Sequence, residues 1–238
     1  MPPRRRAPLT RERVLKAALK LADDGGFHSL SMRKVASKLR VEAMSLYNHV
    51  AGKEDIVDGL VDIVFSEIEV ATPGTVDWKT AMRDRAISVR AALNRHRWAV
   101  GLMEGRMNPG PANIANHNAV MGCLREGGFE FRDAVHAYSV MDAYIYGFAL
   151  QERGLPFDAP EETAAVMRRQ SENVPSMADY PYLVETALEL EKGGYDYEVE
   201  FLFGLDLILD AIERYKAGIK PAEAEPGSTP GRRAARGT

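Results

Sequence analysis

The sequence contains little cysteine and no long hydrophobic run. Its 238 residues include one cysteine, Cys123, which excludes an internal disulfide and favours a reducing compartment, the cytoplasm. The most apolar stretch, residues 134–150, is short for a membrane span and contains His136 and Asp142, so we expect no membrane-spanning helix. The amino terminus carries arginines without an apolar run, unlike a secretory signal.

Patterns typical of catalysis and metal binding are also missing. The five histidines are scattered, and no two of them have the i,i+4 spacing of helical metal ligands. The chain contains no nucleophile, base and acid constellation and no phosphate-binding loop. Glu126 and Asp142 are isolated carboxylates, which is weak evidence for a catalytic base. We therefore expect neither an enzyme nor a metal or other cofactor.

No strand-like alternation of apolar and polar residues occurs, whereas a helical spacing recurs through the whole chain. Thr10, Ser31 and Asp77 are typical helix N-caps, and glycine pairs follow two of the helical stretches. The sequence therefore predicts an all-α fold. We expect helices over about residues 11–22, two within 32–49, then 53–70, 77–95, 98–104, 112–126, 132–153, 160–171, 180–192 and 195–217, with a mobile stretch over 172–179.

Residues 32–49 predict two short helices around a tight turn. Each helix has an apolar face, and we expect the two faces to pack together: Val35, Ala36 and Leu39 in the first helix, and Leu46, Tyr47 and Val50 in the second. The other face of the second helix is small or polar and free to meet a partner. This pattern predicts a helix-turn-helix, whose second helix enters the DNA major groove.

The charge distribution favours the same interpretation. Residues 1–55 hold 12 Lys and Arg against 6 Asp and Glu, whereas the rest of the chain holds 19 against 28. A helical hairpin can be plain scaffold and a charged face can be plain surface, but their coincidence indicates DNA. We expect a DNA-binding domain over residues 1–55, a ligand-binding and dimerisation domain over 56–217, and a disordered Pro/Gly/Ala-rich tail over 218–238.

Two of the predicted helices, residues 132–153 and 195–217, are apolar on almost every side. Such helices must be buried all round, which in a chain of this size suggests that one side faces another subunit. A two-fold homodimer would also supply the paired heads that a palindromic DNA site requires. The alternative is that both are central helices of a monomer.

From Thr10 to Val57 the chain reads TRERVLKAALKLADDGGFHSLSMRKVASKLRVEAMSLYNHVAGKEDIV, and this segment resembles the tetracycline repressor family. The body resembles the C-terminal domain of the tetracycline repressors in its Asp77-Trp78 pair and in the runs LNRHR, GGFEFRDAVHAYSV and FLFGLDLIL. The resemblance implies an all-helical homodimer with a DNA-binding head and a ligand cavity, in which an effector releases DNA by moving the fourth helix. Arg40, where the family often has glycine, and Glu42, where it often has serine, depart from the pattern.

The magnesium and drug site of the tetracycline-binding members does not carry over. Those members use a histidine and a glutamate, and the matching positions here are Met103 and Gln151. A thioether is too soft and an amide carries no charge, so neither replaces a ligand of a hard cation well. We expect that this protein does not sense tetracycline.

The candidate site residues follow from the resemblance and from residue chemistry. We expect the positive side chains to hold phosphates, the small or polar ones to touch base edges, and Tyr47 and His49 to clamp the backbone, although Tyr47 is equally suited to core packing. The DNA candidates are Arg33, Lys34, Ala43, Met44, Ser45, Tyr47, Asn48, His49 and Lys53. The ligand candidates are Phe65, Glu69, Arg85, Val89, Trp98, Met103, Met107, Val120, Tyr138, Met141, Asp142 and Tyr144.

Asp142 is the sharpest ligand candidate because it lies amid apolar residues and a buried charge needs a partner. We expect that partner to be Arg85, with a tyrosine hydroxyl or a cationic ligand as alternatives. The sequence thus predicts a DNA-binding regulator, most simply a repressor, that binds operator DNA and a small-molecule effector. Two alternatives stay open: a constitutive DNA-binding dimer without an effector, and a small-molecule-binding helical protein with a vestigial head.

Overall fold

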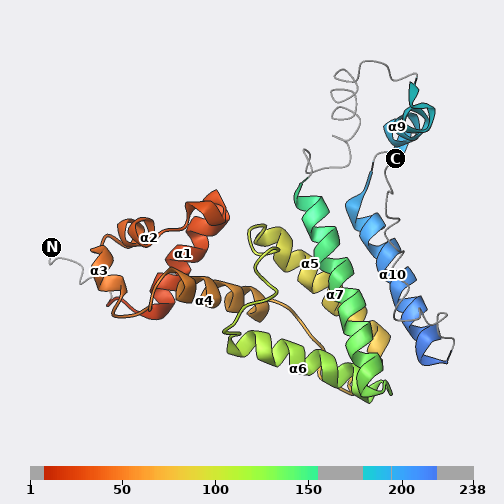
Figure 1. Cartoon of the computed structure of the whole chain (residues 1–238), viewed down its shortest axis with the longest axis horizontal. Coiled ribbons are helices and arrows are strands. Elements are labelled where there is room, and N and C mark those ends of the chain that lie inside the picture. The colour runs from red at the N-terminus through yellow and green to blue at the C-terminus, as the bar shows by residue number, and fades with distance from the viewer. Residues whose placement is uncertain (1–7, 155–178, 194, 219–238) are drawn as a thin grey trace, which may run out of the picture.

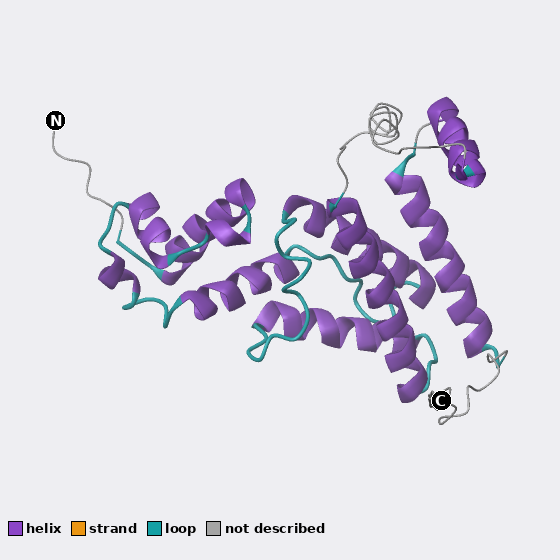
Figure 2. Ribbon diagram, turned by 45° about the horizontal axis from the view of Figure 1, so that its top comes forward, coloured by secondary structure: helices purple, strands orange, loops and turns teal. Residues whose placement is uncertain are grey.

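The computed structural model describes residues 8–154, 179–193 and 195–218 (Figures 1 and 2). Every regular element in these ranges is a helix, which confirms the predicted all-α fold. The helices are α1 (Arg11–Gly25), the short 3-10 helix η1 (Phe27–Ser29), α2 (Met32–Leu39), α3 (Ala43–Leu46), α4 (Lys53–Ser66), α5 (Trp78–Arg95), α6 (Pro111–Glu126), α7 (Phe131–Arg153), α9 (Pro181–Gly193) and α10 (Tyr197–Lys216). None of the described helices is both long and apolar enough to cross a membrane.

The expected N-caps are confirmed. The side chains of Thr10 and Ser31 each accept a hydrogen bond from the backbone N–H three residues further on. The Asp77 carboxylate accepts two, from the backbone N–H groups of Lys79 and Thr80. These bonds satisfy backbone donors that have no partner inside the helix, so they set where α1, α2 and α5 begin.

One expected helix does not form, and the expected end of another is wrong. Residues 98–104 form successive turns instead of a helix, because Gly101 interrupts the run and Gly105 adopts a positive φ of 74°. The helix expected to reach Val70 ends at Ser66, and the Glu69 N–H then donates to the Ser88 hydroxyl on α5 instead of continuing the helix. The segments expected over residues 160–171 and 172–178, the arginines at 4–6 and nearly all of the expected tail lie outside the described residues.

Helices α1, α2 and α3 form the head, and the first turns of α4 complete its core. The side chains that meet there are small or branched, and Ala18, Val35, Leu46 and Val57 are fully buried. Small residues let helices this short approach closely and exclude water from a small core. As a result, the head has a core of its own at one end of the molecule (Figure 1).

The body is built around α7, which packs against α5, α6 and α10. The body core is filled by larger side chains, among them Met82, Leu93, Leu124, Ile145 and Leu205, all exposed by 2% or less. Figure 1 shows α4 running from the head into the body, and α4 packs against both α1 and α6. Helix α4 therefore contacts both the head and the body.

Candidate DNA-binding interface and ligand site

The turn between α2 and α3 keeps its helix-turn-helix geometry although Arg40 replaces the expected glycine. Arg40 adopts the left-handed conformation, with φ 58° and ψ 45°. Its N–H donates to the Ser37 carbonyl and the Val41 N–H donates to the Ala36 carbonyl, the pair of bonds that ends a helix at a left-handed residue. The hydrogen bonds of the turn are intact, and the side chain at position 40 adds strain that glycine avoids.

Helix α3 exposes the face that was expected to meet bases. Leu46 and Val50 are buried and attach the segment to the head, whereas Met44 is 74% exposed and Asn48 is also exposed. Tyr47 is 49% exposed, so the expectation that it packs with Leu46 and Val50 is wrong. It follows Leu46 by one residue, about 100° around the helix, and therefore points away from the core.

The remaining DNA candidates lie around the same face. Arg33 and Lys34 are exposed in the first turn of α2, and Lys53 is exposed at the start of α4. The Lys53 Nζ lies 4.8 Å from the centre of the Phe27 ring, a cation–π contact that orients this side chain. The other three candidates, Ala43, Ser45 and His49, are half-buried.

The start of α4 is fixed to α1 by an ion pair. Both guanidinium NH2 groups of Arg11 donate to the Asp55 carboxylate, at 2.8 and 2.7 Å, and the Ala51 N–H donates to the same carboxylate. The hydrogen bond from Arg11 holds the pKa of Asp55 below its usual value. These bonds hold the first turn of α4, which carries Lys53, in place against α1.

A buried ion pair occupies the centre of the body. Arg85 on α5 is 2% exposed and Asp142 on α7 is 6% exposed, and the guanidinium donates to both carboxylate oxygens at 2.6 and 3.3 Å. This confirms the expected partner of Asp142. Burial lowers the pKa of Arg85, but the adjacent carboxylate outweighs burial and raises that pKa overall.

Two tyrosines lie beside this pair. The Arg85 guanidinium carbon is 5.5 Å from the centre of the Tyr138 ring, and burial together with the Asp142 charge raises the pKa of both Tyr138 and Tyr146. The Arg85 Nε and the Tyr146 hydroxyl are buried and have no hydrogen-bond partner within the described part of the chain. Buried donors in this state are costly to leave unmatched, so a molecule that brings an acceptor to them gains free energy there.

The structure does not bring all twelve ligand candidates together. Phe65, Val89, Met103, Val120 and Met141 are buried in the common core, whereas Glu69 is exposed and Met107 is 92% exposed on a loop. Tyr144 donates its hydroxyl to the Phe201 carbonyl on α10 at 2.9 Å and stacks on the Phe201 ring. Tyr144 therefore fastens α10 to α7, on a side of α7 away from Asp142.

Trp98 belongs to a different cluster, at the junction of head and body. Its indole N–H donates to the carboxylate of Asp23, the residue near the end of α1, at 2.7 Å. His96 is 6% exposed and bridges the two parts, with Nδ1 2.8 Å from Asp23 and Nε2 3.2 Å from Glu67 at the end of α4. Arg95 donates to the same Glu67.

The sequence did not single out Tyr146 and His96, which the structure places in these two clusters. Tyr146 follows Asp142 by four residues, a spacing that puts both on one face of α7, and this signal was available. Nothing in the sequence pairs His96 with Asp23 and Glu67, because the three residues are far apart along the chain and only the packing of three helices joins them.

The residues at the expected magnesium positions do not fit a hard cation. Met103 is buried and Gln151 is exposed at the end of α7. The neighbouring Glu152 is occupied, because both of its carboxylate oxygens accept hydrogen bonds from Arg90 at 3.0 and 2.6 Å. No group of three His, Cys, Asp or Glu side chains within the described ranges is arranged to hold a metal ion.

Two family models match this chain. Residues 14–60 match the model for bacterial regulatory proteins of the tetR family, and residues 71–215 match the tetracyclin repressor-like C-terminal domain. The second match alone spans more than half of the chain. The protein belongs to the tetracycline repressor family. It is therefore a DNA-binding transcriptional regulator of a family whose members respond to ligands.

Individual relatives agree with this assignment. The transcriptional repressor DrrR1 of Streptomyces coeruleorubidus is 33% identical over 86% of this chain and 77% of its own length. The class D tetracycline repressor of Escherichia coli is 31% identical over 87% of this chain and 90% of its own length. The structure of ActR from Streptomyces coelicolor in complex with actinorhodin has a TM-score of 0.74 and 26% identity over 90% of this chain and 100% of that one.

Proposed function

We propose that this regulator represses transcription by binding a palindromic operator as a homodimer, and that a small-molecule effector releases it. The observation that carries the proposal is the exposed face of α3 and its flanks, where Met44, Tyr47 and Asn48 project beside Arg33 and Lys53. Side chains of this kind read base edges and hold phosphates. Such a repressor acts in the cytoplasm, where its operator is.

The homodimer is supported by apolar faces that the single chain leaves uncovered. On α10, Val199, Phe203 and Leu207 follow one another at four-residue spacing and are 55–63% exposed. On α7, Val140 and Leu150 are exposed, and a Cβ at the intervening Gly147 would meet no atom of the described residues within 4 Å. Two such faces bury each other when two copies pair, with α7 and α10 of each copy forming a four-helix interface.

The buried Arg85, Asp142, Tyr138 and Tyr146 cluster supports an effector that carries a hydrogen-bond acceptor. The Arg85 Nε and the Tyr146 hydroxyl are donors without partners, whereas the surrounding core is apolar. A mostly apolar molecule with one or two carbonyl or similar acceptors matches this chemistry. Because the Asp142 charge is already neutralised by Arg85, a cationic effector has little to gain there.

The contacts of α4 support the proposal that a movement in the body reaches the head. Its Asp62 carboxylate accepts hydrogen bonds from the Ala112 and Asn113 N–H groups, at 2.9 and 3.0 Å, and so caps α6 from outside. A Cβ on Gly110 would lie 2.2 Å from the Asp62 side chain, so glycine is required for this approach. Arg106 lies in the same segment and donates to Asp58 on α4 at 2.7 Å.

An effector that displaces the segment before α6 therefore also shifts α4, because the two are joined by these hydrogen bonds. Because the first turns of α4 complete the head core, a shift of α4 changes the separation of the two recognition faces in the dimer. A dimer that reads two half-sites needs them roughly 34–36 Å apart. Binding of the effector to a state with another separation lowers the affinity for DNA by the difference in the effector's affinity for the two states.

Fluorescence anisotropy with labelled DNA from the region flanking the protein's own gene tests DNA binding. We expect an affinity that falls steeply with salt, and a Lys53→Gln variant whose slope of log K against log[salt] is smaller by about one per protomer. Lys79→Gln is the control, because Lys79 pairs with Asp210 and Glu213 in the body and is expected to leave the slope unchanged. Equal slopes for both variants, or no binding in dilute buffer, contradict the proposal.

Effector release is tested by screening metabolites for a rise in melting temperature, since a ligand that binds only the folded state stabilises it. We expect each stabilising compound to dissociate the DNA complex and to bind Tyr146→Phe more weakly. Tyr144→Phe is the control, because the Tyr144 hydroxyl bonds to α10 and not to the buried cluster. A ligand that fills the body without releasing DNA contradicts the proposal.

A further inference from the structure

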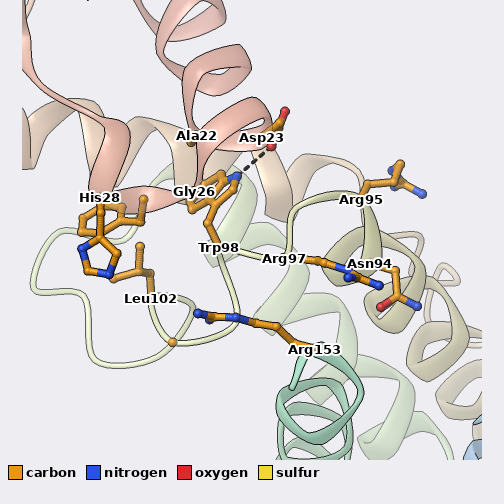
Figure 3. A pocket seen from close by; sticks show the side chains of 12 residues that line it. Ala22, Asp23, Gly26, His28, Asn94, Arg95, Arg97, Trp98, Leu102 and Arg153 are labelled. Atoms are coloured by element: carbon orange, nitrogen blue, oxygen red, sulfur yellow. Dashed lines mark hydrogen bonds between the residues drawn. The ribbon is translucent and has the colours of Figure 1, made fainter. Parts of the chain in front are cut away.

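A pocket lies between the head and the body, apart from the buried Arg85 cluster. Its volume is about 430 Å3, and it is lined by residues of α1 and η1 from the head and by residues 94–102 from the body (Figure 3). Arg153, the last residue of α7, closes one side. A pocket of this size accommodates a molecule of one or two rings.

The inner wall of this pocket is apolar and rigid. Trp98 is 6% exposed, and its indole N–H bond to Asp23 fixes the orientation of the ring. Phe27 of the head and Leu102 of the body are half-buried and also line the pocket. Two half-buried apolar side chains beside an immobilised indole favour contact with a flat ring, because little side-chain freedom is lost on binding.

The rim of the pocket is basic. Among the described residues, three arginines, Arg95, Arg97 and Arg153, line it together with one carboxylate, Asp23, which accepts a hydrogen bond from Trp98 and faces His96. Arg95 is held by Glu67 at the end of α4. Arg153 has no hydrogen bond or ion pair within the described part of the chain, and Figure 3 shows its side chain extending from α7 toward Leu102.

We propose that this pocket binds a small aromatic anion, with its ring against Phe27, Leu102 and the small exposed part of Trp98, and its negative group on Arg153. A guanidinium matches a carboxylate with two parallel hydrogen bonds, so a carboxylated ring fits the rim and the wall together. A neutral ring of the same size gains only the contact with the wall. The site differs from the buried cluster in that Arg153 is exposed and has no carboxylate partner among the described residues.

The position of the pocket gives its occupant an effect on the head. The occupant contacts Phe27 in the head and Trp98 and Arg153 in the body, so its binding depends on how the two parts are placed. It thereby favours one placement and changes the affinity for DNA, a consequence that rests on the proposed function. By linkage, DNA changes the affinity for the anion by the same factor.

Binding is tested by quenching of Trp98 fluorescence with 4-nitrobenzoate. Trp78→Phe leaves Trp98 as the only tryptophan, and calorimetry on the unmodified chain gives the same dissociation constant without the substitution. The matched neutral probe is 4-nitrobenzamide. We expect saturable quenching by the carboxylate and at least tenfold weaker binding of the amide. Equal affinities, or no saturable binding of the carboxylate, overturn the proposal.

Arg153→Gln separates this pocket from binding elsewhere. We expect it to weaken 4-nitrobenzoate at least tenfold and to leave 4-nitrobenzamide unchanged. Arg132→Gln is the control, because Arg132 is an exposed arginine at the opposite end of the same helix. An effect of Arg153→Gln below twofold on 4-nitrobenzoate, or an equal effect of Arg132→Gln, overturns the assignment.

The coupling is tested by repeating the DNA titration with saturating 4-nitrobenzoate. We expect at least a fivefold change in DNA affinity that Arg153→Gln removes. Quenching without any change in DNA affinity contradicts the coupling to DNA but is consistent with binding of the anion in the pocket. A chain that binds no DNA at all but still shows the quenching contradicts the proposed function and leaves the pocket standing.

Discussion

The head and the body of this regulator differ in whether they bury polar side chains. Among the described residues of the head, every buried side chain is apolar, and its charged groups lie on the surface. The body instead buries Arg85 and Asp142 and leaves two polar atoms there without partners. It also exposes an apolar stripe on α10. The head thus buries its apolar side chains within one chain. The body has buried polar atoms that a ligand could bond to and an exposed apolar surface that a second copy could cover.

This difference follows from what each part has to do. A DNA reader needs a fixed shape, which a small core of closely packed aliphatic side chains provides. A part that responds to a ligand needs two states of similar free energy, and a buried charged pair with unmatched donors allows the packing to change with occupancy. Substitutions that alter one part and leave the other intact test this comparison.

The largest effect is expected at the buried pair. Asp142→Ala leaves Arg85 buried and uncompensated, so we expect a loss of about 3–5 kcal/mol in the free energy of unfolding. Asp206→Ala removes the partner of the exposed Arg83 and is the control, with an expected loss below about 1 kcal/mol. Urea unfolding followed by circular dichroism measures both. Similar losses of unfolding free energy for the two variants would contradict the expectation that the buried pair matters more to stability than the surface pair.

The next effect is expected at the apolar stripe of α10. Phe203→Glu places a charge in the proposed dimer interface, so we expect the dimer dissociation constant to rise more than a hundredfold, about 3 kcal/mol. Ile114→Glu on α6 introduces the same charge at another exposed apolar residue and is expected to leave the dimer intact. Analytical ultracentrifugation at micromolar concentration measures both. An unmodified chain that sediments as a monomer contradicts the proposed dimer.

A smaller effect is expected in the head. Arg40 adopts a left-handed conformation that glycine adopts without strain, so Arg40→Gly is expected to raise the free energy of unfolding by about 1 kcal/mol. Arg40→Ala removes the same charge but keeps a Cβ, and we expect it to bring no gain. Thermal unfolding without DNA compares the two. A gain shared by both variants would mean that the charge, and not the backbone, is responsible.

The smallest effect is expected at the junction of the two parts. Burial raises the pKa of Glu67, but hydrogen bonds from Arg95 and His96 outweigh burial and lower that pKa overall. A lowered pKa means stability that is present above about pH 4.5, the ordinary value for this carboxyl, and is lost as the pH falls through the lowered pKa. Because Glu67 is 32% exposed, we expect well under 1 kcal/mol.

Melting temperatures measured from pH 7 down to pH 3 test this expectation. The difference between the unmodified chain and Glu67→Gln is expected to shrink toward acid pH. Glu126→Gln, which changes an exposed carboxyl on α6, is the control and should follow the unmodified chain throughout. A difference between the unmodified chain and Glu67→Gln that does not change with pH contradicts the role given to the carboxylate.

Much of the fold could be predicted because its causes are local. The caps at Thr10, Ser31 and Asp77 and the spacing of apolar residues act within a few residues, and the structure confirms them. The helix expected over residues 98–104 does not form, and the reason is also local, the glycine at 101. The roles of the DNA and ligand residues and the domain boundary at residue 55 stay predictions.

The sequence by itself determined the helices, the basic head and the need of Asp142 for a partner, because propensity, periodicity and charge are properties of neighbouring residues. Only the tertiary structure decided that Tyr47 faces solvent, that Tyr144 fastens α10, and that Trp98 and Arg153 meet at one pocket. These outcomes depend on how distant helices pack, and the packing is selected by the free energy of the whole core.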